Sequence, residues 1–300
     1  MANTLGTVSS SLIIQTALSL VYTKRPALRR FGMSFTNPDG SNEAKLDQAV
    51  ISRIKSIPAV GTFADAAVGH VTTDVSVTID AHKQILHTFT ADELAATDRN
   101  YVQEAAEPLA VAIGNHIVDY LAALITAANF PNKTTVPAGW GYTNTLVPVR
   151  QKLVERGVPD FNRYFFGNCD VYSALLTDPL VIAALNNPSN GDAIRTGRLP
   201  DVAGMALDEY PALPTGGNQV GFAGVPDALV YAGRVERDPK SVLPSANFPG
   251  NFGRVTDPLS GFTVTVCEWI GTDLTANVRV SWYEGRAVGN ANNGERLVTG

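Results

Sequence analysis

The pattern of apolar and polar positions opens with a short helix followed by a polar stretch. Apolar residues recur at helical spacing from Leu12 to Tyr22, after three serines that can cap a helix. The chain from Arg30 to Asn42 is polar and rich in turn residues. We therefore expect an amphipathic helix and then an extended arm with little core of its own.

Between residues 49 and 89 the pattern becomes that of β-strands. Apolar and polar residues alternate over residues 75–80, and a turn near Asp80 and Ala81 is expected to return the chain as a second strand over residues 82–89. This predicts a long hairpin with a loose tip. Because an isolated two-stranded hairpin is at best marginally stable in water, a neighbouring subunit is the obvious surface for it to pack against.

The longest helical pattern runs from about Asp98 to Ala128, after Thr90-Ala91-Asp92-Glu93, which fits a capping box. If continuous, the helix spans about 45 Å at roughly 1.5 Å per residue. Pro108 lies inside the pattern and must kink the helix or start a second segment, because an interior proline removes a backbone hydrogen bond.

The rest of the chain mixes short helices and strands. A helix over residues 145–156 is expected to end at Gly157, and the aromatic series Phe161, Tyr164, Phe165 and Phe166 is expected in the core. An antiparallel pair is expected from the alternation over residues 262–267 and 277–282. Further elements are expected as a buried strand at 164–166, helices at 171–176 and 180–185, and strands at 205–210 and 228–231. The predicted fold class is α+β.

Composition narrows the class of protein. The 300 residues are 45% hydrophobic and 17% charged, which is typical of a globular chain. The formal charge is -5, and the short basic patch from Lys24 to Arg30 is interpreted as solvating a helix end, so nucleic-acid readout is not signalled. Cys169 and Cys267 form no CxxC pair, which favours a reducing cytoplasm. The opening apolar stretch is interrupted by polar residues, which argues against a signal peptide or a membrane span.

Motifs with an attached catalytic mechanism are missing from the sequence, which has no nucleophile elbow, P-loop, dinucleotide turn, zinc-protease helix or EF-hand loop. His116 and Asp119, three residues apart on the long helix, are interpreted as a surface hydrogen bond rather than a catalytic base. Glu104 and Glu107 are interpreted as complementing the helix dipole. The sequence therefore predicts no catalytic, cofactor-binding or metal-binding residue.

Other candidate residues also have structural interpretations. His82 and His87 would lie on opposite faces of a regular strand, so they are not expected to bind one metal ion together. Cys267 has no histidine near it in sequence and is interpreted as an inert thiol. Trp282 and Tyr283 would mark either a contact surface or a terminal strand that packs on the long helix.

Three passages carry a family resemblance. They run from Val75 through His82-Lys83 to Leu94, from Ala193 to Met205, and over the ending Trp282-Tyr283-Glu284-Gly285-Arg286-Ala287-Val288. In this order they resemble the coat-protein branch of the tailed-phage major capsid proteins. These share the Johnson fold, also called the Hong-Kong-ninety-seven fold, and the resemblance covers nearly the whole chain.

The resemblance implies a domain organisation. The chain would have an N-terminal arm over residues 1–48, an extended β-hairpin loop over 49–90 and a peripheral domain with the long spine helix over 91–142. A mainly axial domain follows over 143–260, and residues 261–300 return to the peripheral domain.

The resemblance also implies a function and partners. The chain would be a structural protein of the virion that self-assembles as hexamers and pentamers into an icosahedral shell around double-stranded DNA, without sequence specificity. It would be assembled in the bacterial host cytoplasm with a separate scaffolding protein and a portal protein, and it would have no membrane partner and no enzyme activity. A decoration protein is a further partner that the resemblance leaves open. Some relatives form a Lys to Asn cross-link, for which Lys55 is a conceivable donor, but no cross-link is predicted.

Two other readings compete with the phage capsid. An encapsulin-type nanocompartment shell resembles the same fold but encloses a cargo enzyme. A cytosolic α+β enzyme with its site in the Gly/Pro-rich middle third is the alternative from a different class. Assembly would separate the enzyme from both shells, and cargo would separate the shells from each other.

Overall fold

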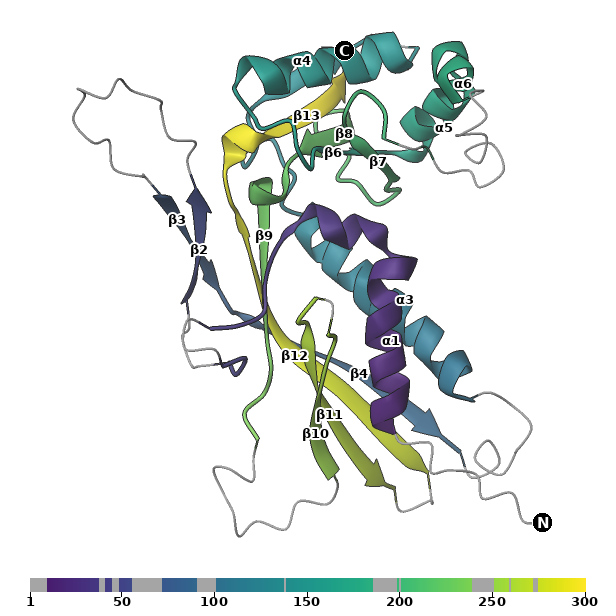
Figure 1. Cartoon of the computed structure of the whole chain (residues 1–300), viewed down its shortest axis with the longest axis vertical. Coiled ribbons are helices and arrows are strands. Elements are labelled where there is room, and N and C mark those ends of the chain that lie inside the picture. The colour runs from purple at the N-terminus through teal and green to yellow at the C-terminus, as the bar shows by residue number, and fades with distance from the viewer. Residues whose placement is uncertain are drawn as a thin grey trace.

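The computed structural model describes residues 10–37, 41–44, 49–55, 72–90, 101–137, 139–185, 199, 201–238, 251–258, 260–271 and 275–300. Two sheets follow one another along the length of the molecule (Figure 1). A two-stranded hairpin stands beside the larger sheet, on the side away from the long helices (Figure 1). The elements contain both helix and sheet, so the predicted α+β class is confirmed.

The larger sheet has six strands in the order β1-β9-β12-β11-β10, with β4 paired to β12. Its centre is β12 (Ala276–Val288), whose thirteen residues pair with β11 and then with β9 along one side and with β4 on the other. The other strands are β1 (Gly32–Ser34), β4 (Ala81–Phe89), β9 (Leu229–Arg234), β10 (Asn251–Thr256) and β11 (Thr263–Ile270). The expected antiparallel pair near the C-terminus is therefore confirmed as β11 and β12.

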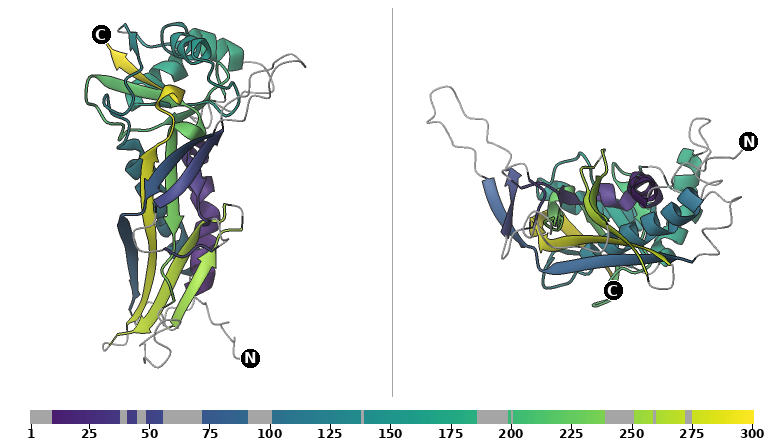
Figure 2. Two further views of the ribbon diagram at one scale, coloured as in Figure 1. Left: turned by 90° about the vertical axis from the view of Figure 1, so that its left-hand side faces the viewer. Right: turned by 90° about the horizontal axis from the view of Figure 1, so that it is seen from below.

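Helices α1 (Ser10–Lys24) and α3 (Tyr101–Ala122) lie together on one face of this sheet (Figure 2). The alternation of β12 turns Val280 and Trp282 toward them, and both side chains are buried. Apolar residues at helical spacing, such as Leu18 of α1 and Ile113 and Ile117 of α3, fill the space above the strands. The predicted amphipathic helix near the N-terminus is confirmed as α1.

The smaller sheet has five strands in the order β5-β13-β8-β6-β7. Strand β6, which lies between β8 and β7, is buried on both faces: Phe165 contributes to the core under the short helices, whereas Tyr164 and Phe166 belong to the core shared with α3. The strands are β5 (Lys133–Val136), β6 (Tyr164–Gly167), β7 (Ala206–Glu209), β8 (Gln219–Gly224) and β13 (Gly294–Thr299), with helices α4 (Val147–Glu155), α5 (Cys169–Thr177) and α6 (Pro179–Leu185).

Most expected elements of this region are confirmed, including the helix end at Gly157, whose φ of 70° is the left-handed conformation that glycine favours. One expectation is wrong. Phe161 is 67% exposed, because it lies in the loop after Gly157 rather than in the strand.

The expected pairing of the strand over residues 75–80 with the strand over residues 82–89 is also wrong. β3 (Thr72–Thr78) pairs with β2 (Ala49–Lys55) over seven residue pairs, whereas β4 pairs with β12. Asp80 and Ala81 do not make a tight hairpin turn, which needs residues such as Asn-Gly that adopt positive φ. The chain instead passes across β12 and joins the larger sheet.

Two further expectations are corrected. The segment after α1 is not a free arm, because Phe31 and Phe35 are buried in the core of the body against Tyr164 of β6 and Tyr231 of β9. The long helix ends at Ala122 instead of Ala128: the backbone continues in tighter turns, and the Asn129 side chain donates to the Leu124 carbonyl. Pro108 lies inside the continuous helix α3, so it does not start a second segment. The proposed capping box falls mostly outside the described residues.

Candidate functional site: the base of the hairpin

The hairpin joins the body where the chain between β3 and β4 crosses β12. The Asp80 amide donates to the Glu284 carbonyl at 3.2 Å, which fixes the crossing to the backbone of β12. A Cβ atom on Gly285 would lie 2.1 Å from the Thr78 carbonyl oxygen and 3.1 Å from the Ile79 Cα. Only glycine leaves room for two backbones this close together.

Under this crossing lies a fully buried carboxylate, that of Glu284. His116 of α3 is 2.7 Å from Oε1, and the Trp282 indole and the Tyr231 hydroxyl donate to Oε2 at 3.1 and 3.2 Å. Burial, and then the negative charge of Glu284, raise the pKa of Tyr231 well above its ordinary value, so the phenol stays a donor. The carboxylate thus joins the long helix, β9 and β12 at one point.

A second link runs from the long helix to the crossing itself. The Tyr120 hydroxyl donates to Asp80 at 3.2 Å, and the Arg286 guanidinium lies 4.2 Å from the centre of the Tyr120 ring. Arg286 also donates to the Tyr120 carbonyl. Burial, followed by the charges of Asp80 and Glu284, raises the pKa of Tyr120 to about 12. The end of α3 is thereby tied to the base of the hairpin.

The chain entering the hairpin is held by Arg234, which is 1% exposed. Its guanidinium donates to the carbonyls of Ser34 and Thr36 at 2.8 and 3.0 Å and to Asn37 Oδ1 at 2.7 Å. Backbone bonds from Ala44 to Val235, and from Val235 to Asn42, close the segment around it. The loop before β2 is therefore built around one buried cation.

Glu236 gathers polar side chains from the strands next to this loop. Its carboxylate is 2.6 Å from His82 Nε2, accepts from Ser281 Oγ at 2.7 Å and lies 3.7 Å from Arg279. Arg254 donates to the Glu236 carbonyl and pairs with Glu43, at 2.9 and 2.7 Å. Charged pairs thus join the loop before the hairpin to β4, β10 and β12.

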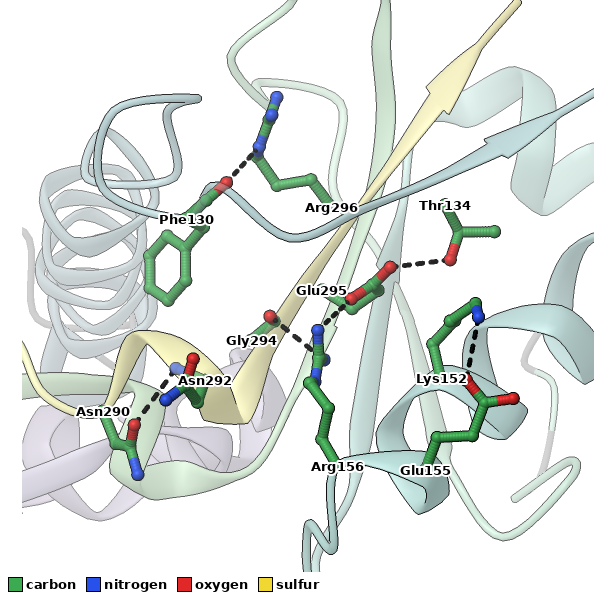
Figure 3. A network of polar contacts seen from close by, with 10 residues as sticks. All are labelled: Phe130, Thr134, Lys152, Glu155, Arg156, Asn290, Asn292, Gly294, Glu295 and Arg296. Atoms are coloured by element: carbon green, nitrogen blue, oxygen red, sulfur yellow. Dashed lines mark hydrogen bonds and ion pairs between the residues drawn. The ribbon is translucent and has the colours of Figure 1, made fainter.

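A separate polar network surrounds the start of β13 in the smaller sheet (Figure 3). The buried Glu295 carboxylate is 2.5 Å from Arg156 Nη1 and accepts from Thr134 at 2.7 Å. The next residue, Arg296, donates to the Phe130 carbonyl at 2.6 Å. The network ties α4 and the connection after α3 to β13.

The structure gives His116 and Asp119, which the sequence had paired, different partners. His116 contacts Glu284, whereas Asp119 accepts from the Tyr210 hydroxyl. Glu107 pairs with Lys24 at 3.3 Å on the surface. None of these contacts aligns a nucleophile with a base.

The remaining candidate residues are placed as follows. Trp282 lies in the core, so the packing alternative holds for it, while Tyr283 stacks on His82 with ring centres 4.2 Å apart. His87 contacts Phe89 instead of the residues around His82. Cys169 and Cys267 are both free thiols. The roles of Glu284 and Arg234 were missed, although a single charge at the end of the apolar strand β9 could have marked Arg234.

Within the described ranges, no three His, Cys, Asp or Glu side chains gather closely enough to hold a metal ion. Among the helices of the described residues, none combines the length and the apolar character needed to span a membrane.

No protein-family model and no curated protein matches the sequence. Several solved structures do match the fold of this chain. The capsid structure of the cyanophage P-SCSP1u matches at 11% identity over 90% of this chain and 86% of that chain, with a TM-score of 0.53. The virus-like particle from Pyrococcus furiosus matches at 12% identity over 95% of this chain and 97% of that chain, with a TM-score of 0.55. The chain therefore has the Johnson fold of phage capsids and related shells.

Proposed function

We propose that this chain is the major capsid protein of a tailed bacteriophage. It self-assembles as hexamers and pentamers into an icosahedral shell that encloses double-stranded DNA. The observation that carries the proposal is the hairpin of β2 and β3, whose described residues contact their own subunit at the base and along one face, on a chain with the Johnson fold.

The hairpin supports the proposal through its packing. Val50 and Val77 turn inward onto Val230 and Ala232 of β9, whereas Ile51 on the opposite face is 58% exposed. A two-stranded sheet gains little stability alone, so its outer face needs a second surface. A symmetric shell offers every copy the same neighbouring surface.

Exposed apolar side chains on the smaller sheet's helical side also support assembly. Val154 of α4 is 49% exposed, Phe161 67% and Leu180 of α6 57%. Large apolar side chains that stay exposed in the free subunit can be buried when copies of the chain associate. We assign them to contacts between copies of the chain.

The domain boundaries follow from the same proposal. Residues 1–48 form the N-terminal arm, 49–90 the extended loop, 91–142 the peripheral domain with the spine helix, 143–260 the mainly axial domain and 261–300 the return to the peripheral domain. Within the loop, β4 belongs to the sheet of the body, so the projecting part ends at Thr78.

The partners in this proposal are a separate scaffolding protein, a portal protein and the packaged DNA, with a decoration protein left open. The chain is placed in the virion after assembly in the bacterial cytoplasm, and it has no enzyme activity. A net charge of -5 suits a wall that touches DNA without gripping it, because phosphate affinity needs clustered cations. An inner shell surface mapped as strongly basic would count against DNA as the cargo.

A shell around a protein cargo, as in encapsulin-type nanocompartments, is the second candidate. The observation that favours it is the likeness to the virus-like particle from Pyrococcus furiosus, which covers nearly all of both chains.

Particles purified after expression with the neighbouring genes and treated with nuclease decide between the two cargoes. Protected double-stranded DNA together with portal protein is expected for the capsid. Particles that hold a protein and no DNA would support the nanocompartment. A protein that sediments only as a monomer or dimer would overturn both and favour the α+β enzyme.

A further inference from the structure

At Gly285 the backbone at the end of the hairpin crosses close to the backbone of β12. The missing side chain lets the Thr78 carbonyl sit where a Cβ would be, at 2.1 Å, and the Thr78 carbonyl carbon is only 2.8 Å from that position. Both contacts are to backbone, which cannot rotate aside as the end of a flexible side chain can. A methyl group at residue 285 must therefore push the end of β3 away by roughly 1 Å to reach ordinary van der Waals contact.

The contacts on either side of Thr78 would turn such a displacement into a rotation of the hairpin relative to the rest of the subunit. One residue before Thr78, Val77 is fully buried against Val230 of β9, so the hairpin is held there. Two residues after Thr78, Asp80 is held by the Glu284 carbonyl and by the Tyr120 hydroxyl. A displacement between two fixed points rotates the strands, and the rotation is carried along about 23 Å of a seven-residue strand.

We propose that Gly285 is the residue that sets the direction in which the hairpin leaves the subunit, and with it the curvature and diameter of the shell. The inference rests on the proposed function, since only an assembled shell has a diameter. Gly285 acts as a positioning residue through Thr78. Tyr120 supports it by tying the crossing to the long helix.

Gly289 provides a matched control. A Cβ on Gly289 would lie 2.0 Å from the Asp227 carbonyl oxygen, a clash of the same depth against backbone, but that carbonyl belongs to the turn before β9 and not to the hairpin. Gly253 of β10 is the neutral control, because a Cβ there has nothing within 4 Å.

The test compares Gly285→Ala, Gly289→Ala and Gly253→Ala. Thermal unfolding of the unassembled subunits measures stability, and electron microscopy measures particle diameter. Gly285→Ala and Gly289→Ala are expected to lower the melting temperature to a similar extent. Only Gly285→Ala is expected to give open sheets or shells of a different diameter. Gly285→Ala shells of wild-type diameter, or an equal change of diameter in Gly289→Ala, would overturn the inference.

A second variant decides the case in which Gly285→Ala does not fold. Tyr120→Phe removes the exposed hydrogen bond to Asp80 and introduces no clash, so its melting temperature should stay near that of the wild type while its diameters spread. A wild-type distribution of diameters in Tyr120→Phe would then refute the inference. A wild-type protein that forms no shells at all overturns the proposed function, and this inference with it.

Discussion

Replacing Arg234 by Met tests whether the loop before the hairpin is built around a buried cation. The guanidinium donates to Asn37 Oδ1 and to the carbonyls of Ser34, Gly233 and Thr36, over 2.7 to 3.0 Å. Burial lowers the pKa of Arg234, but an arginine remains charged at neutral pH. The variant leaves four acceptors without their donor. At about 1 kcal/mol each, partly offset because a buried charge is also removed, the loss of unfolding free energy is about 3 kcal/mol.

Urea denaturation of the unassembled subunit measures this loss, and limited proteolysis should show new cleavage near residues 34–44. The control is Arg254→Met, because the Arg254 side chain is 29% exposed and pairs with Glu43 at the surface. That variant should lose under about 1 kcal/mol. An Arg234→Met subunit within about 1 kcal/mol of the wild type, or as destabilised as Arg254→Met, would refute the reasoning.

Two further predictions concern the network around Glu295 and the buried tyrosines. Glu295→Ala leaves the guanidinium of Arg156 without its buried partner and should lower the unfolding free energy by about 3 kcal/mol, whereas Glu155→Ala on the exposed face of α4 should leave it unchanged within error. Equal losses of unfolding free energy for Glu295→Ala and Glu155→Ala in urea denaturation would contradict the role of Glu295 as the buried partner of Arg156. Burial raises the pKa values of Tyr164 and Tyr231, so the folded chain keeps both protons at a pH where the unfolded chain, with an ordinary tyrosine pKa near 10, releases them. Stability should therefore be full below pH 10 and fall above it by about 1.4 kcal/mol per pH unit for each tyrosine. Phenolate absorbance from these residues should appear only with unfolding, and its appearance in the folded subunit would contradict their burial.

Periodicity predicted the elements whose signal is local. The helix α1, the strands β11 and β12 and the glycine stop after α4 were all readable, because each depends on residues close together in sequence. Strand pairing was not readable in the same way. β3 and β4 are separated by two residues and still pair with different partners, and the chain between them crosses β12 beside Gly285, more than two hundred residues later.

The site was less predictable than the fold. The ending Trp282 to Val288 carried a family resemblance, but its physical content emerged only in three dimensions, where Glu284, Gly285 and Arg286 each hold a different neighbour. Arg234 gave no signal beyond a charge at the end of an apolar strand. Its partners are backbone carbonyls almost two hundred residues earlier in the chain, which no local pattern contains.

Electron microscopy of the purified protein, expressed with its neighbouring genes where it is insoluble alone, tests the central claim most directly. The account predicts closed icosahedral shells tens of nanometres across. A small, monodisperse monomer or dimer, even with a scaffolding protein present, would contradict it.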